Sequence, residues 1–199
     1  MNKPKIKICG VNEIKIIDCC INNGVKYFGL IFYEKSPRFV DQELTTKIIN
    51  YVNNKRIKNC INILFMSRLL ITKGIYETIT AFELLSKKYD NIKLFICGDG
   101  KEKDDVTKMI NKNNNIEFFG YIRDEKKYQI FSKSDIFIYP TYEDGMPNVV
   151  LEAMAFGLPV ITRPVGGLKD FFIHGEHGYI TESKSPKVYL NYLEKLITS

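Results

Sequence analysis

Residues 62–100 read NILFMSRLLITKGIYETITAFELLSKKYDNIKLFICGDG, and this stretch decides the fold class. Residues 62–66 and 93–97 are short runs rich in Ile, Leu and Phe, which have the length of buried strands. Between them, residues 73–88 carry apolar side chains at helical spacing, namely Ile75, Ile79, Phe82 and Leu85. A strand, a helix and a second strand in this order form the βαβ unit of a parallel sheet.

The same alternation of apolar runs and amphipathic stretches continues along the whole chain and predicts an α/β protein. Eight strands are predicted, at residues 6–9, 27–32, 62–66, 93–97, 116–119, 136–139, 159–162 and 178–180. Helices fill most of the gaps between them. Eight strands of this kind suit either a closed barrel or an open, doubly wound sheet, and periodicity does not separate the two.

The composition is that of a globular protein with reduced cysteines. Of the 199 residues, 45% are hydrophobic and 26% are charged, which excludes a disordered chain. No apolar run approaches the roughly 18 residues of a membrane span or the core of a signal peptide, so we expect a cytoplasmic protein. The formal charge of +6 is spread along the chain, so nucleic acid is not an expected partner. The five cysteines include no Cys-x-x-Cys pair, which argues against disulfides and a zinc ribbon.

A polar, basic stretch marks a predicted boundary. Residues 53–59 read NNKRIKN and lack periodicity, so we interpret them as a linker. They separate a segment of residues 1–56 from a domain of residues 57–199.

Charged residues and glycines follow several of the predicted strands. Arg68 comes just after one strand and Lys73 opens the next helix, an arrangement that can hold a diphosphate from two sides. Further on, Asp144 precedes a glycine loop, and Glu152 follows eight residues later within a helix. A loop and a helix N-terminus at the mouth of an open sheet would face a ligand, and the two acids could accept hydrogen bonds from sugar hydroxyls.

Together these positions resemble the donor-binding C-terminal domain of the GT-B glycosyltransferases, in particular the retaining enzymes of family 4, over residues 61–183. Seven elements occur in the family's order: Ser67-Arg68-Leu69 with Lys73-Gly74, Gly98-Asp99-Gly100, Phe119-Gly120-Tyr121-Ile122, residues 134–140, the loop with the two acids, residues 157–162, and Val165-Gly166-Gly167. The resemblance implies a Rossmann-like parallel sheet with helices on both faces, preceded here by a short βαβα segment.

The resemblance also implies catalytic roles. Arg68 and Lys73 would bind the donor diphosphate and stabilise charge on the leaving nucleotide, and Asp144 would contact the transferred sugar. The family usually has Glu at the position of Asp144, and the adjacent Glu143 is an alternative for this role. Such enzymes need no metal, so no metal site and no cofactor beyond the nucleotide-sugar donor are expected.

The remaining donor contacts are implied in the same way. Glu152 would bind the ribose hydroxyls, and Gly120 and Ile122 would lie against the base. Backbone amides for the sugar and phosphate would come from one loop, formed by Gly145, Met146, Pro147 and Asn148.

Residues 1–54 resemble another family, in the first two βα units of phosphoribosylanthranilate isomerase, through residues 5–11 and 28–40. The resemblance implies that Cys9 would be a general base and that Arg38 would contact the substrate. The isomerase also needs a general-acid Asp after its sixth strand, whereas Asp135 here precedes a strand. Because that active site is incomplete, we interpret Cys9 as a small buried side chain.

Three functions stay open at this point. The first is the donor-binding part of a retaining glycosyltransferase, which the motifs from Arg68 to Glu152 favour. The alternatives are the isomerase of tryptophan biosynthesis and a module that binds a nucleotide sugar without catalysis. Residues 1–54 are too few for an acceptor domain, so we expect little transfer unless a partner chain supplies one. The expected acceptor is a glycan or a lipid-linked precursor, and the positive charge would suit the inner surface of a membrane.

Overall fold

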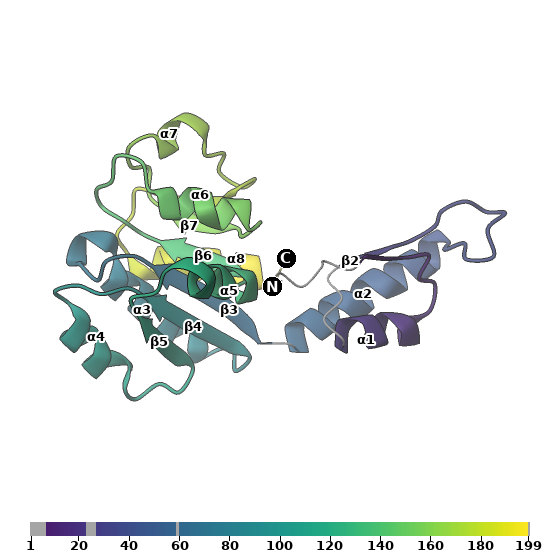
Figure 1. Cartoon of the computed structure of the whole chain (residues 1–199), viewed down its shortest axis with the longest axis horizontal. Coiled ribbons are helices and arrows are strands. Elements are labelled where there is room, and N and C mark those ends of the chain that lie inside the picture. The colour runs from purple at the N-terminus through teal and green to yellow at the C-terminus, as the bar shows by residue number, and fades with distance from the viewer. Residues whose placement is uncertain (1–6, 23–26, 59, 199) are drawn as a thin grey trace. The chain divides into compact units, whose positions relative to one another are not determined.

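The computed structural model describes residues 7–22, 27–58 and 60–198. The chain divides into two compact units, residues 1–59 and residues 60–199, which are described separately (Figure 1). Among the described residues, no helix is long and apolar enough to cross a membrane.

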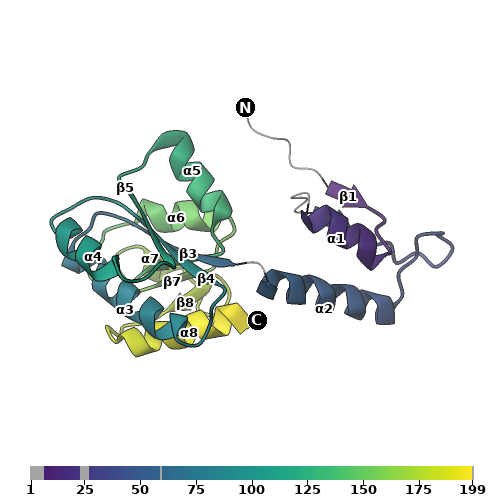
Figure 2. The same cartoon turned by 90° about the horizontal axis from the view of Figure 1, so that it is seen from below.

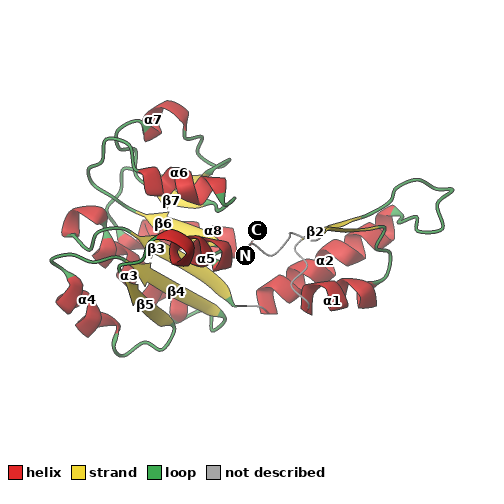
Figure 3. Cartoon of the chain, viewed as in Figure 1, coloured by secondary structure: helices red, strands yellow, loops and turns green. Residues whose placement is uncertain are grey.

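The larger unit is built on an open sheet of six parallel strands (Figure 3). The strands lie in the order β5-β4-β3-β6-β7-β8. Their bounds are β3 (Ile61–Met66), β4 (Ile92–Cys97), β5 (Ile116–Gly120), β6 (Ile136–Tyr139), β7 (Val160–Thr162) and β8 (Gly178–Ile180). The order reverses at β3, which has β4 on one side and β6 on the other. Open α/β sheets bind ligands at such a reversal, beyond the carboxyl ends of the strands.

Helices cover both faces of this sheet, as the resemblance implies. Helices α3 and α8 pack together on one face, and α5 and α6 lie on the other (Figure 2). The helices are α3 (Ile75–Ser86), α4 (Lys103–Ile110), α5 (Asp124–Lys133), α6 (Asn148–Ala155), α7 (Leu168–Phe171) and α8 (Pro186–Thr198), with a 3₁₀ turn η1 (Ile71–Lys73) before α3. Because both faces are covered, the central strands are buried along most of their length.

The predicted alternation of strands and helices is confirmed. All eight predicted strands are present, with described ends that differ by three residues at most, and residue 6 of the first predicted strand lies outside the described residues. The closed-barrel alternative is wrong, because β5 and β8 end the six-stranded sheet and the other two described strands pair with each other.

The smaller unit is the predicted βαβα segment. It consists of β1 (Lys7–Cys9), α1 (Ile14–Asn22), β2 (Tyr27–Gly29) and α2 (Gln42–Lys58), and β1 pairs with β2 in parallel. Its small core contains four fully buried side chains, Val11, Ile17, Val40 and Ile48.

The interpretation of residues 53–59 as a linker is wrong for residues 53–58, because α2 continues to Lys58. Lys and Arg favour helix, and the stretch contains no Gly or Pro that would end one. Polarity without periodicity therefore indicated a polar helix end rather than irregular chain. Residue 59 lies outside the described residues.

Candidate functional site

The first wall of the candidate site is formed where β3 ends. Arg68 follows the strand, and the turn η1 then carries Lys73 into the protein, where only 6% of the residue is exposed. Gly74 makes this path possible, because its φ is 76° and a Cβ atom there would lie 2.5 Å from the carbonyl oxygen of Pro140. The chain therefore places the Lys73 ammonium beneath the carboxyl ends of the strands.

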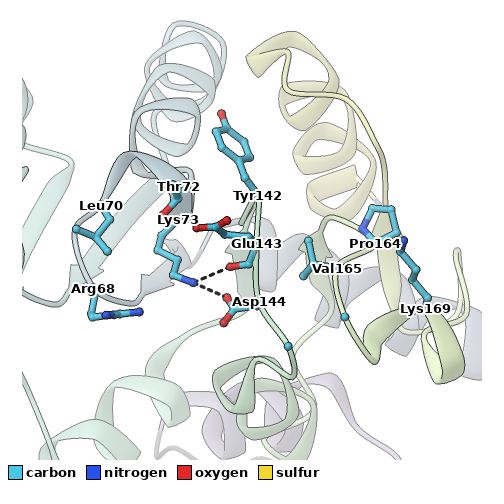
Figure 4. A pocket seen from close by; sticks show the side chains of 12 residues that line it. Arg68, Leu70, Thr72, Lys73, Tyr142, Glu143, Asp144, Pro164, Val165 and Lys169 are labelled. Atoms are coloured by element: carbon cyan, nitrogen blue, oxygen red, sulfur yellow. Dashed lines mark hydrogen bonds and ion pairs between the residues drawn. The ribbon is translucent and has the colours of Figure 1, made fainter.

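The second wall is the loop between β6 and α6. Lys73 Nζ donates to Asp144 Oδ2 at 2.8 Å and to the backbone oxygen of Glu143 at 2.9 Å (Figure 4). The side chain of Asp144 is 23% exposed, whereas Glu143 lies on the surface. Of the two neighbouring acids, Asp144 is therefore the one whose carboxylate pairs with the buried lysine.

Two neutral hydroxyls share the same carboxylate oxygen. Tyr139 donates to Asp144 Oδ2 at 2.7 Å and Thr141 donates to it at 3.1 Å. Burial by itself would raise the pKa of Asp144, but the hydrogen bonds from Lys73, Tyr139 and Thr141, with the charge of Lys73, bring that pKa below its ordinary value. Asp144 is thus held as a carboxylate. Burial and the neighbouring Asp144 raise the pKa of Tyr139, which keeps the phenol protonated as a donor.

A third wall comes from the loop after β7. Gly166 has a φ of 46°, and a Cβ atom there would lie 1.7 Å from the carbonyl oxygen of Gly145. The amide of Gly167 donates to the same oxygen at 2.8 Å. This backbone contact joins the two loops that carry the site.

The three walls form an open pocket of about 670 Å³ (Figure 4). It is lined by Arg68, Leu70, Thr72, Lys73, Tyr142, Glu143, Asp144, Gly145, Pro164, Val165, Gly166 and Lys169. Two cations on one wall and two acids on the adjacent loop suit a ligand with both phosphates and hydroxyls.

The structure brings together four of the ten residues that the resemblance implies as donor contacts, and Glu143, the alternative to Asp144, also lines the pocket. Arg68, Lys73, Asp144 and Gly145 line the pocket. The others lie outside its lining: Gly120 ends β5, Ile122 follows it, Met146 and Pro147 lead into α6, and Asn148 and Glu152 lie on α6.

Glu152 is paired with a cation that the sequence did not point to. Lys127 Nζ of α5 lies 2.6 Å from Glu152 Oε1, and the two side chains are 27% and 36% exposed. The two helices are also joined by rings, since Tyr128 and Phe131 of α5 both stack on Phe156 after α6. The ion pair and the stacked rings therefore join Glu152 and its helix to α5.

Sequence reasoning also missed Tyr139 and Thr141. A tyrosine closing an otherwise apolar buried strand was an available signal, because a buried phenol hydroxyl needs a partner. The sequence does not show that this partner is Asp144, because the loop that carries Asp144 meets the tyrosine only in the folded protein.

The isomerase-like residues lie in the smaller unit. A Cβ atom on Gly10 would lie 3.0 Å from Arg38 Nη1, so the guanidinium packs against the residue that follows Cys9. Cys9 is exposed, so our interpretation of it as a buried side chain is wrong. The strand β1 has one described neighbour, β2, and this leaves the cysteine at an uncovered end.

The pairing of Asp144 with Lys73 predicts a specific acid response. A carboxyl whose pKa is lowered on folding stabilises the protein fully above its unfolded pKa of about 3.9, and this contribution is lost as the pH falls through the lower folded pKa. We therefore expect the unfolding free energy of Asp144→Asn, measured with urea from about pH 5 downward, to fall less steeply than that of the parent chain. Asp105→Asn, which removes an exposed acid 3.3 Å from Lys108, is the control, and equal flattening in both variants would contradict the prediction.

Comparisons with known proteins place the chain in a family. The family model described as glycosyl transferases group 1 matches residues 47–199. The capsular polysaccharide biosynthesis glycosyltransferase CapM of Staphylococcus aureus is 29% identical over 190 residues, which are 94% of this chain and 46% of CapM. The chain spans less than half the length of CapM and of the next curated relatives.

Solved structures agree. The C-terminal domain of the glycosyl transferase group 1 family protein LpcC from Francisella tularensis is 25% identical, with a TM-score of 0.62 over 74% of this chain and 82% of that domain. Anabaena Alr3699/HepE, solved with UDP and glucose, shares the fold at 20% identity, with a TM-score of 0.61 over 94% of this chain and 52% of that one.

These matches give no support to the isomerase resemblance of residues 1–54 or to the isomerase alternative. The family model covers more than half of the chain, including every residue that lines the pocket. The chain therefore belongs to the glycosyl transferases group 1 family.

Proposed function

We propose that residues 57–199 form the nucleotide-sugar-binding domain of a retaining glycosyltransferase and that residues 1–56 are a separate segment. The observation that carries the proposal is the buried ion pair of Lys73 and Asp144, which lies beside Arg68 at the carboxyl ends of β3 and β6. A ligand with two phosphates and a sugar matches this combination of cations and acids at the strand-order reversal.

The two cations bind the diphosphate. Arg68 offers planar paired donors, and Lys73 offers a point charge whose orientation Asp144 and the backbone of Glu143 hold. As the sugar leaves, negative charge grows on the nucleoside diphosphate, and cations already in place stabilise it. This compensation makes a metal ion unnecessary. In the retaining reaction, the leaving diphosphate helps to deprotonate the acceptor on the same face of the sugar.

The other donor contacts come from α6 and the loops around it. Asp144 accepts from the transferred sugar, and Glu152, oriented by Lys127, accepts from the ribose hydroxyls. Gly120 and Ile122 lie against the base. The loop before α6 offers amides from Gly145, Met146 and Asn148, whereas Pro147 has no N–H and only shapes the path.

The acceptor comes from outside this pocket. CapM is named for capsular polysaccharide biosynthesis, and we propose a glycan or its lipid-linked precursor as the acceptor class here. A further domain or a partner chain would supply the acceptor site. A formal charge of +6 suits work in the cytoplasm at the inner surface of an anionic membrane.

Titration of the whole chain with UDP, GDP and ADP by calorimetry tests the proposal. We expect saturable binding of one nucleoside diphosphate and a loss of roughly tenfold or more in affinity in Glu152→Ala, because a hydrogen-bonded carboxylate is removed from the ribose site. Glu117→Ala is the matched control, since Glu117 also pairs with a lysine, Lys93, but lies on β5 and has no proposed contact with the donor. No binding of any of the three nucleotides, or equal losses in both variants, would contradict the proposal.

A further inference from the structure

A buried tyrosine lies directly beneath the pocket, and the proposed mechanism does not use it. Tyr139 ends β6 and is 2% exposed, with its ring 6.1 Å from the rings of Phe65 and Phe137. The apolar contacts fix the ring, and the hydroxyl emerges at the floor of the site. Ser67, at the end of the neighbouring strand β3, donates to this hydroxyl at 3.3 Å.

The Tyr139 hydroxyl, which accepts from Ser67, is in turn a donor to the acid of the site. Tyr139 donates to Asp144 Oδ2 at 2.7 Å, and Lys73 and Thr141 donate to the same oxygen at 2.8 and 3.1 Å. All three bonds converge on Oδ2, and none of them uses Oδ1. The carboxylate is therefore anchored by one oxygen in one orientation, and its second oxygen stays outside this network.

Asp144 meets the Tyr139 hydroxyl with a short side chain. Four residues lie between the two, and this loop folds back so that the phenol meets the carboxylate. A Glu at this position, which the family resemblance leads one to expect, would carry its carboxylate one carbon farther from the backbone.

We infer that Tyr139 is a positioning residue, which holds Asp144 by Oδ2 so that Oδ1 meets the sugar of the donor. The inference rests on the proposed function for its ligand, but the contact between the two residues stands without it. Tyr139 is not itself a lining residue of the pocket and is not placed against the reacting atoms. Its effect passes through Asp144, which pairs with Lys73 and lines the pocket together with the charged residues Arg68, Glu143 and Lys169.

The first test is a double-mutant cycle with Tyr139→Phe and Asp144→Asn. Calorimetry compares UDP, GDP or ADP, whichever binds, with the same nucleotide carrying glucose. We expect Tyr139→Phe to weaken the binding of the nucleotide sugar by roughly five- to tenfold, the size expected for one hydrogen bond to a charged group. The binding of the free nucleotide should weaken by less than about twofold. In the Asp144→Asn background, Tyr139→Phe should change neither affinity, because the acid it positions is gone.

The second test needs no ligand. With ¹³C-labelled aspartate carboxyls, the resonance assigned to Asp144 through Asp144→Asn is titrated by NMR in the parent chain and in Tyr139→Phe. Removal of a donor from the carboxylate should move the midpoint of this titration upward. Tyr189→Phe is the matched control, because Tyr189 is also fully buried and its hydroxyl donates to the Ser183 carbonyl, away from the pocket.

The outcomes separate the two proposals. An Asp144 midpoint in Tyr139→Phe that equals the parent midpoint would overturn the positioning role, whether or not any nucleotide binds. A shifted midpoint without nucleotide binding would support the positioning of Asp144 and contradict the proposed function instead. If Tyr139→Phe does not fold, Ser67→Ala tests the same path, since the Ser67 hydroxyl reaches Asp144 through Tyr139. A smaller upward shift is expected there, and no shift would overturn the inference.

Discussion

Replacement of Lys73 by Met is expected to abolish measurable donor binding and to lower the unfolding free energy by about 2–4 kcal/mol. The side chain of Lys73 is 7% exposed and that of Asp144 is 23% exposed, so Asp144 would keep a largely buried charge without its partner. The backbone oxygen of Glu143 would lose the hydrogen bond from Lys73 in the same change. The pKa of Asp144 should rise, because its burial would then be opposed by fewer favourable contacts.

Lys88→Met is the control for this prediction. Lys88 Nζ lies 2.6 Å from Glu194 Oε1, but its side chain is 56% exposed and the pair is outside the pocket. Exposed pairs of this kind contribute little, so urea unfolding and calorimetric titration should resemble those of the parent chain. If the Lys73 and Lys88 variants lost the same stability and affinity, the buried ion pair would not be the centre of the site.

Replacement of Gly166 by Ala is expected to separate the two loops of the pocket. The added Cβ would lie 1.7 Å from the Gly145 carbonyl oxygen and 2.4 Å from that of Asp144, so one backbone segment must move. We expect a loss of about 2–4 kcal/mol in unfolding free energy, from overpacking together with the cost of a side chain at positive φ. Nucleotide affinity should fall by more than roughly tenfold, since Asp144 moves with its backbone.

Gly157→Ala is the control that separates the cost of a side chain at positive φ from the cost of a steric clash. Gly157 has a φ of 74°, but nothing lies within 4 Å of the position of its Cβ. The variant should therefore lose only about 1 kcal/mol of unfolding free energy, the cost of an alanine in the left-handed region. Its nucleotide affinity should be unchanged. Both quantities are measured by urea unfolding and calorimetry, as for Lys73. If the Gly166 variant kept the nucleotide affinity of the parent chain, the backbone contact between Gly166 and Gly145 would not be needed for the pocket to bind its ligand.

Much of the fold was predictable because its signals are local. The apolar runs of β3, β4 and β6 are buried on both faces and appear as continuous hydrophobic stretches. The helix α3 was visible through apolar spacing, and four of its buried residues are the ones that the spacing marked. The end of α2 was misread, because a polar helix end has no periodic apolar face to show where it lies.

The candidate site was predictable where charged residues and glycines follow one another in the order typical of the family. Arg68, Lys73, Asp144 and Gly145 were singled out, and they line one pocket. The choice between Asp144 and Glu143 could not be made from the sequence, because both acids lie on the same loop. The buried Lys73 distinguishes them in the structure, since its ammonium pairs with Asp144.

By itself, the sequence determined the α/β class, the strands of the sheet and the family of the larger unit, because these depend on the order and periodicity of neighbouring residues. Only the tertiary structure decided that the sheet is open, that Tyr139 holds Asp144 and that Lys127 meets Glu152. Strand order and side-chain pairing depend on where distant segments pack. A hydrogen bond or ion pair forms only after packing has brought its two atoms within about 3 Å of each other.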